Sequence, residues 1–105
     1  MVLWIAYKRW NSQRVIAMLP ELKRAGALLV DVRSAGEFAN VTALGAVNIP
    51  LTQLSRRLGE IPNAAPVVDC CASGTRSGMA KLLLTKNGYK KVHNIGTWDK
   101  CLDKS

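Results

Sequence analysis

The sequence predicts an α/β domain in which a parallel sheet carries helices on both faces. Short apolar runs alternate along the chain with segments whose apolar residues recur at helical spacing, and glycine or proline separates them. Strands separated by helices in this way pair in parallel, since each crossover helix returns the chain to the same end of the sheet. With 105 residues, 49% hydrophobic and 21% charged, the chain suits one globular domain.

The first third of the chain contains two predicted strands and one helix. Residues 14–18 (RVIAM) predict a short edge strand. Pro20 suits the first turn of a helix, where its missing N–H is harmless, and Gly26 suits the end of that helix. The continuous apolar run 27–32 (ALLVDV) predicts a strand that is covered on both faces.

The rest of the chain continues this alternation. A turn and a short helix are predicted over residues 34–38, and a brief strand over 45–50 is closed by Pro50. Leucines at helical spacing predict a helix over 51–62. The remaining predicted elements are a strand over 66–70, a helix over 77–87 and a strand over 90–95.

Residues 1–12 are predicted to form an N-terminal arm ahead of the domain, which covers residues 13–105. Six apolar residues run from Met1 to Ala6 into the aromatic and basic group YKRW. This pattern resembles the last turns of a membrane-spanning helix with its interfacial collar, although it is far shorter than the roughly 20 residues that a span needs. A short strand or a packing arm is the other interpretation.

Composition narrows the compartment and the partners. Three cysteines without repeated spacing favour a reducing compartment, so we expect a cytoplasmic domain, with membrane attachment through the N-terminus as the alternative. The net charge of +8 comes from scattered residues, with no zinc-ligand spacing and no RNA-binding motif. We therefore expect a monomer that binds small anionic substrates or an acidic partner protein. No nucleic acid, metal ion or cofactor is expected.

The segment CCASGTRS (70–77), which follows the strand over 66–70, carries the candidate chemistry. Ligands of parallel sheets lie at the carboxyl ends of strands, and this rule selects Cys71. Small residues and Gly74 let the backbone curl ahead of a helix, so that its N–H groups face inward and form a nest for an anion. Arg76 adds a full positive charge. These surroundings favour a thiolate, which is a nucleophile.

The two adjacent cysteines are not expected to share this role. Successive strand residues point to opposite faces, so we predict that Cys70 faces the core and Cys71 enters the loop. A disulfide between them is not expected, because neighbouring Cα atoms lie about 3.8 Å apart, below the usual disulfide range. Cys101 is predicted to be incidental. Its alternative role is to pair with Cys71, either to resolve a persulfide or to sense redox state.

The chain resembles a single-domain rhodanese, a sulfurtransferase, in three segments followed by Trp98: LLVDVRSAGEF (28–38), GAVNIPL (45–51) and VVDCCASGTRSGMAKLLLTKNGYKKVHNI (67–95). The resemblance covers about residues 20–100 in the right order. It implies a rhodanese-like α/β fold with a five-stranded, mostly parallel sheet. It also implies an enzyme that takes sulfane sulfur from a donor such as thiosulfate onto a cysteine persulfide and passes it to cyanide or a thiol.

The same resemblance assigns roles to individual residues. It implies that Cys71 carries the sulfur. The implied cradle around that sulfur consists of Ala72, Ser73, Gly74, Thr75 and Arg76. Arg76 would hold the sulfonate of thiosulfate or orient the loop, and Ser77 would begin the helix behind the loop. Structural support without a catalytic role is expected from Asp31, Arg33 and Glu37, including an ion pair between Arg33 and Glu37.

Some positions depart from the family pattern. The usual GHIPGA reads VTALGA (41–46), so that Thr42 and Leu44 replace a histidine and a proline. Thr97 replaces one glycine of the usual pair near the end of the domain. The first departure affects a loop near the sheet edge, where it leaves stability or partner contact in question. The sulfur chemistry does not depend on it.

Two other functions stay open. One is a persulfide relay that passes sulfur between proteins with little turnover. The other is a phosphatase or arsenate reductase, whose relatives of this fold use Cys-x5-Arg loops. The spacing from Cys71 to Arg76 is Cys-x4-Arg, a tighter ring that suits one added sulfur atom. A phosphatase also needs a general acid, and Asp69 is predicted to lie behind the loop.

Overall fold

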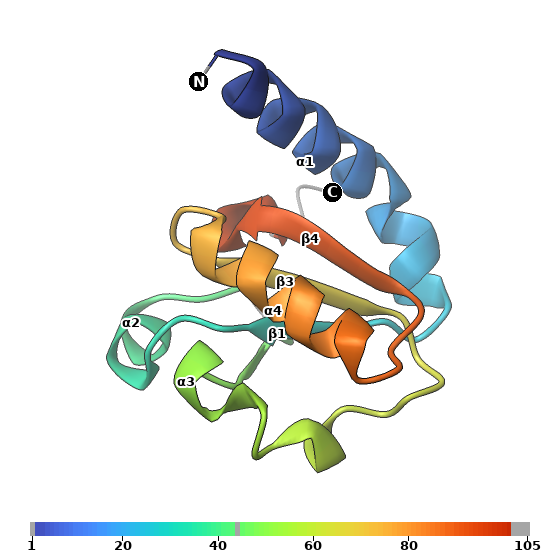
Figure 1. The fold of residues 1–105 in the computed structure, drawn as a ribbon, viewed down its shortest axis with the longest axis vertical. Helices are drawn as coiled ribbons and strands as arrows, with labels where there is room; N and C mark the ends of the chain where they lie inside the picture. The colour runs from blue at the N-terminus through green and yellow to red at the C-terminus, as the bar shows by residue number, and fades with distance from the viewer. Residues whose placement is uncertain (1, 44, 102–105) are drawn as a thin grey trace.

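The structure is a computed structural model that describes residues 2–43 and 45–101. Its four helices are α1 (Val2–Arg24), α2 (Ala35–Asn40), α3 (Leu51–Leu54) and α4 (Thr75–Lys86), and two short 3-10 helices are η1 (Leu58–Glu60) and η2 (Trp98–Cys101). The four strands are β1 (Leu28–Asp31), β2 (Val47–Asn48), β3 (Val67–Cys71) and β4 (Val92–Thr97). They form one parallel sheet in the order β2-β1-β3-β4 (Figure 1).

The sheet has four strands among the described residues, not the predicted five, because residues 14–18 belong to α1. The prediction of an edge strand there was wrong. Val15, Leu19 and Leu22 recur at helical spacing and are buried against the sheet, which the short run RVIAM alone does not reveal. Pro20 lies inside the helix on its exposed side, so it does not disturb the packed face.

The first residues of the chain also differ from their second interpretation, a short strand or a packing arm, because the structure has α1 there. It runs without a break from Val2 to Arg24 and so crosses the expected boundary between residues 12 and 13. Within residues 2–43 and 45–101, no helix combines the length and the apolar character that crossing a bilayer requires.

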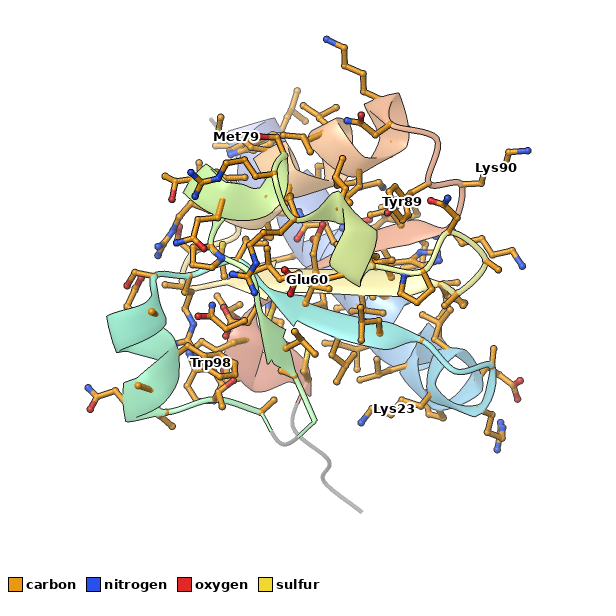
Figure 2. All side chains as sticks on the ribbon, turned by 90° about the horizontal axis from the view of Figure 1, so that it is seen from below. Lys23, Glu60, Met79, Tyr89, Lys90 and Trp98 are labelled. Atoms are coloured by element: carbon orange, nitrogen blue, oxygen red, sulfur yellow. The ribbon has the colours of Figure 1, made fainter. Side chains whose placement is uncertain are left out.

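Each face of the sheet has its own hydrophobic core. One core, beneath α3 and α4, includes Val30, Val67 and Leu84. The other, beneath α1 and η2, includes Val15 and Val68. Tyr89 and Met79 lie on one side of the sheet, and Trp98 and Lys23 lie on the other (Figure 2). The predicted cover of helices on both faces is therefore confirmed.

The helix predicted over residues 51–62 is divided into α3 and η1. The hydroxyl of Tyr89 lies 2.9 Å from the carbonyl oxygen of Leu58 and 2.7 Å from that of Ile61. Tyr89 thus donates to carbonyls at the end of this irregular segment and ties it to the chain that follows α4. Ile61 belongs to the core beneath α3 and α4, and Leu58 packs against it.

The edge strand β4 is held by polar side chains from α1. Asn11 donates from Nδ2 to the carbonyl of Asn94 at 2.8 Å, and Ser12 donates from Oγ to the carbonyl of Ile95 at 2.9 Å. Gly96 has a φ of 98° beside Ser12, and a Cβ at Gly96 would lie 3.0 Å from that Oγ. Glycine is therefore required where the helix and the strand meet so closely. These contacts fix the N-terminal half of α1 beside the carboxyl ends of the strands.

Candidate active site

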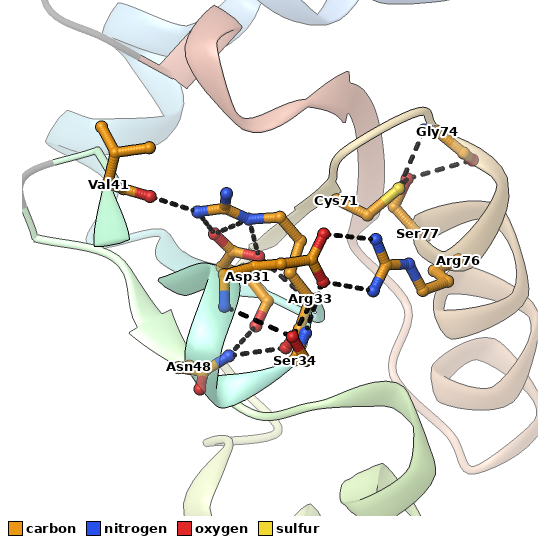
Figure 3. Close-up of polar contacts among 10 residues, drawn as sticks. Asp31, Arg33, Ser34, Val41, Asn48, Cys71, Gly74, Arg76 and Ser77 are labelled. Atoms are coloured by element: carbon orange, nitrogen blue, oxygen red, sulfur yellow. Dashed lines mark hydrogen bonds and ion pairs between the residues drawn. The ribbon is translucent and has the colours of Figure 1, made fainter. Parts of the chain in front are cut away.

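The sulfur of Cys71 lies at the carboxyl end of β3, inside the turn that leads into α4. Gly74, the residue that precedes α4, has a φ of 93°, a left-handed conformation that turns the backbone back toward β3. Its N–H donates a hydrogen bond of 2.8 Å to Sγ of Cys71 (Figure 3). The loop folds around the sulfur, and Cys71, the last residue of β3, is fully buried, at 0% exposure.

The hydroxyl of Ser77 completes the polar surroundings of this sulfur. Its Oγ lies 3.3 Å from Sγ of Cys71 and 3.1 Å from the carbonyl oxygen of Gly74, to which it donates (Figure 3). A hydroxyl has one proton to donate and two lone pairs that accept. It therefore accepts from the thiol while it donates to Gly74, or donates to the thiolate after a rotation. Ser77 serves both protonation states of Cys71 without moving its backbone.

The pKa of Cys71 is lowered from its ordinary value. Burial is the largest influence and opposes ionisation, but the side chain of Ser77 and the backbone N–H groups of Ser77, Ser73 and Gly74 together outweigh it. These donors stabilise the thiolate, because hydrogen bonds to a charged acceptor are stronger than those to a neutral one. The site therefore favours a nucleophilic sulfur with no histidine base beside it.

Cys70 has the opposite surroundings. Hydrogen bonding with Cys101 and burial raise the pKa of the Cys70 thiol. Both residues belong to the core beneath α1, whereas Cys71 belongs to the core beneath α4. Cys101 thus lies with Cys70 on the other face of the sheet, and this placement removes the basis for pairing Cys101 with Cys71.

Arg76 is tied to α2 by a two-pronged ion pair. Its Nη1 and Nη2 lie 2.8 Å and 3.1 Å from the two carboxylate oxygens of Glu37 (Figure 3). Arg76 first, and then the backbone and hydroxyl of Ser34, lower the pKa of Glu37 to about 2. The predicted ion pair between Arg33 and Glu37 was wrong, because Glu37 faces the loop and its charge is used by Arg76.

Glu37 has a second task that the sequence analysis missed. Ser34 and Glu37 form a capping box at the start of α2, in which each side chain bonds the backbone N–H of the other residue. The sequence signal was present as the spacing S-x-x-E in SAGE. The same carboxylate therefore fixes α2 and the loop around Cys71.

Asp31 and Arg33 form a buried ion pair beneath this loop. Nε and Nη2 of Arg33 lie 2.9 Å and 2.7 Å from Oδ2 of Asp31, and Nη2 also donates to the carbonyl of Val41. The guanidinium lies 4.9 Å from the ring centre of Trp98. Asn48, which the sequence analysis did not select, donates to the carbonyls of Asp31 and Arg33. The cluster holds the β1–α2 connection, which positions Glu37.

The remaining loop residues face outward. Ala72, Ser73 and Thr75 are exposed, and of these three the backbone of Ser73 contributes to the lowered pKa of Cys71. Nζ of Lys8 in α1 donates to the carbonyl of Ser73 at 3.1 Å. No motif in the sequence signals this contact over 65 positions. Of the two family positions that are replaced in the segment 41–46, Thr42 has a buried hydroxyl without a partner among the described residues, and Leu44 lies outside them.

Comparison with known proteins adds to this geometry. A family model described as the rhodanese-like domain matches residues 14–100. The chain belongs to this family. This rhodanese-like domain has the α/β fold that the resemblance implied, with helices on both faces of a parallel sheet, but the sheet has four strands among the described residues and not the implied five.

Two relatives and one solved structure show the extent of the similarity. The uncharacterised protein YqhL of Bacillus subtilis is 44% identical over 88 residues, which cover 80% of this chain and 70% of YqhL. The thiosulfate sulfurtransferase PspE of Escherichia coli is 35% identical over 69 residues, which cover 64% of this chain and 66% of PspE. A crystal structure described as rhodanese with anions from E. coli matches with a TM-score of 0.66 at 30% identity, over 70% of this chain and 89% of that one.

Proposed function

We propose that this rhodanese-like domain is a sulfurtransferase in which Cys71 carries sulfane sulfur as a persulfide. The observation that supports the proposal most directly is the surroundings of Cys71 at the end of β3, where the N–H of Gly74 and the hydroxyl of Ser77 contact its sulfur and its pKa is lowered. A sulfurtransferase for thiosulfate among its relatives supports thiosulfate as the donor. The reduced thiols that this chemistry needs fit a reducing compartment such as the cytoplasm.

Two displacements at sulfur would complete the reaction. The Cys71 thiolate attacks the outer sulfur of thiosulfate, the sulfur–sulfur bond breaks, and sulfite leaves with the electron pair. Cyanide or an acceptor thiolate then attacks the terminal sulfur of the persulfide. Thiocyanate or an acceptor persulfide is released, and the thiolate of Cys71 is the leaving group. A lowered thiol pKa favours the second step, since a more acidic thiol leaves faster.

The loop residues take distinct parts in this proposal. The backbone of Ala72, Ser73, Gly74 and Thr75 forms the cradle for the added sulfur. Ser77 adjusts its hydroxyl to each charge state of Cys71. Arg76 orients the loop through Glu37, because both of its terminal nitrogens already bind that carboxylate. Asp31 and Arg33 support the loop from below. Because Cys71 is fully buried, the loop must open before a donor reaches the sulfur.

The persulfide relay is the second candidate, and the closed loop favours it. A buried sulfur that needs an opening event suits a protein that loads at one partner and unloads at another. Measured turnover separates the two candidates. Rapid cyanide-dependent turnover with thiosulfate supports the enzyme, whereas complete loading of Cys71 with slow release supports the relay.

Mass spectrometry of the intact protein after exposure to thiosulfate tests the proposal. We expect a gain of one sulfur atom that cyanide removes. Cys71→Ser should abolish this gain, and Cys70→Ser, its matched neighbour, should retain it. Equal loading of the wild type and Cys71→Ser would overturn the proposal. A melting temperature for each variant shows whether a loss of loading reflects unfolding.

A further inference from the structure

The N-terminal end of α1 exposes an unusual amount of apolar surface. Figure 1 shows this end projecting past the sheet, and we call residues 2–10 the α1 tip. Its large apolar and aromatic side chains are exposed by between 49% for Tyr7 and 85% for Leu3. The others in this range are Val2, Trp4, Ile5 and Trp10. A helix of a folded domain normally keeps such residues on its packed side.

These side chains surround the helix instead of forming one stripe. Consecutive residues of an α-helix are separated by about 100° around its axis, so the four residues from Val2 to Ile5 cover every side. All four are exposed. A partner protein or a second copy of the chain would cover one side of the helix. A lipid environment covers all sides.

The base of the tip carries the residues that favour a membrane surface. The rings of Tyr7 and Trp10 lie 6.2 Å apart, and Nζ of Lys8 lies 5.8 Å from the ring centre of Trp4. Tryptophan and tyrosine concentrate at the boundary between lipid headgroups and water, and lysine and arginine attract anionic headgroups. No acidic residue precedes Glu21 in the sequence, and the net charge of the whole chain is +8.

We propose that the α1 tip inserts end-on into the surface of an anionic lipid bilayer. The six residues from Val2 to Tyr7 extend about 9 Å along the helix axis. That length matches the boundary between headgroups and acyl chains, about 5–10 Å deep. The aromatic and basic collar then lies among the headgroups, and the domain stays in water. This inference is independent of the reaction proposed for Cys71.

A groove between α1 and α4 offers the main alternative. This cavity of about 470 Å³ is lined by Trp4, Tyr7 and Lys8 of α1 and by Met79 and Leu82 of α4, among others. A peptide seated in it would cover Trp4 and Tyr7. It would leave the neighbouring apolar residues of the tip in water, because Leu3 and Ile5 do not line the groove. Lipid therefore explains more of the exposed surface.

Insertion would also place the reactive loop at the membrane surface. Lys8 belongs to the collar and donates to the carbonyl of Ser73 in the loop around Cys71. The tip and the loop lie at the same end of the sheet (Figure 1). Sulfur donors and acceptors would then meet Cys71 beside the lipid headgroups.

Co-sedimentation of the full chain with lipid vesicles tests this inference. The vesicles contain phosphatidylcholine and phosphatidylglycerol in about a 2:1 ratio, and vesicles of phosphatidylcholine alone are the neutral comparison. Leu3→Glu should lower the partition coefficient at least about tenfold, because an apolar anchor becomes a charge. Leu82→Glu introduces the same charge at an exposed helix position that lines the groove. This variant should change the partition coefficient by less than about threefold. Arg9→Gln should weaken binding about fivefold on the anionic vesicles alone.

Comparing Leu3→Glu with Leu82→Glu separates membrane insertion from binding in the groove. A larger loss for Leu82→Glu than for Leu3→Glu would overturn the inference in favour of the groove. Equal weak binding of all variants would overturn it as well. Loading of Cys71 with thiosulfate, measured without vesicles, should be the same in Leu3→Glu and the wild type. A failure of the sulfur chemistry is thereby distinguished from a failure of membrane binding.

Discussion

Cys70 and Cys71 are neighbours in the sequence and differ in almost every property that determines reactivity. Cys71 faces the α4 side of the sheet, where the N–H of Gly74 and the hydroxyl of Ser77 lower its thiol pKa. Cys70 faces the α1 side, where hydrogen bonding with Cys101 and burial raise its pKa. Both are almost fully buried, so exposure does not distinguish them.

The difference indicates that hydrogen-bond donors, and not access to water, determine which of these two thiols has the lowered pKa. Burial opposes a charge on either thiol. Only the sulfur at the end of β3 reaches the turn where backbone N–H groups converge before α4. One step back along the strand, the alternation of a β-strand directs the other sulfur into an apolar core. A shift of one residue along β3 therefore determines on which face of the sheet a sulfur lies and whether its surroundings favour the thiolate.

The largest expected effect is a difference in alkylation between the two cysteines. Iodoacetamide should modify Cys71 at least about a hundredfold faster than Cys70, because a local opening of the loop exposes a thiolate, whereas Cys70 needs opening of a core. The rate at Cys71 should fall as the pH drops through its lowered pKa. Peptide mass spectrometry over a pH series gives the alkylation rates of Cys70 and Cys71. In the urea-unfolded protein these two rates should be equal. Similar rates in the folded protein would contradict the comparison.

The second prediction concerns a buried acid on the same side of β3 as Cys71. Both side-chain oxygens of Asp69 are buried without a hydrogen-bond partner among the described residues, and burial raises the pKa of Asp69 well above 3.8. The folded protein thus binds this proton more tightly than the unfolded chain does. The associated stability is fully present below about pH 4 and is lost as the pH rises through the raised pKa.

Asp69→Val should therefore stabilise the fold, by about 1–3 kcal/mol at pH 8, because it removes an unpaired polar group from the core. Urea unfolding of the wild type and the variant at pH 5 and pH 8 measures the free energy of unfolding. The variant should exceed the wild type by less at pH 5 than at pH 8. Asp69→Asn keeps the polar atoms but does not titrate. It should therefore make the free energy of unfolding less dependent on pH, without increasing it as much as Asp69→Val does. A loss of stability in Asp69→Val at both pH values would show that the carboxyl has a partner.

Much of this comparison could be predicted from the sequence. The run VVDCC gives the strand, its alternation separates the two cysteines, and the small residues after Cys71 give the turn. These features depend on neighbours along the chain. For that reason local rules were sufficient for the loop and for the assignment of Cys70 to the core.

Features that depend on distant partners could not be predicted in this way. Arg33 had two carboxylates within four positions, and only the fold shows that it binds Asp31 while Glu37 turns to Arg76. The contact between Lys8 and Ser73 joins segments with no shared motif. The strand expected over 14–18 failed because a five-residue apolar run is compatible with a strand or a helix, and packing of α1 on the sheet decides between them.

The smallest expected effect comes from removing one hydrogen-bond partner from each cysteine. Ser77→Ala deletes the hydroxyl beside Cys71 and should raise its thiol pKa, which slows loading with thiosulfate about tenfold at pH 7. Cys101→Ala removes the partner of Cys70 on the other face and should leave loading unchanged, although it creates a small cavity that costs about 1 kcal/mol. The rate of persulfide formation measures the effect of each substitution on loading, and urea unfolding measures its effect on stability. If Cys101→Ala slowed loading as much as Ser77→Ala, the two faces of the sheet would not be chemically independent, and the contrast between the adjacent cysteines would lose its structural basis.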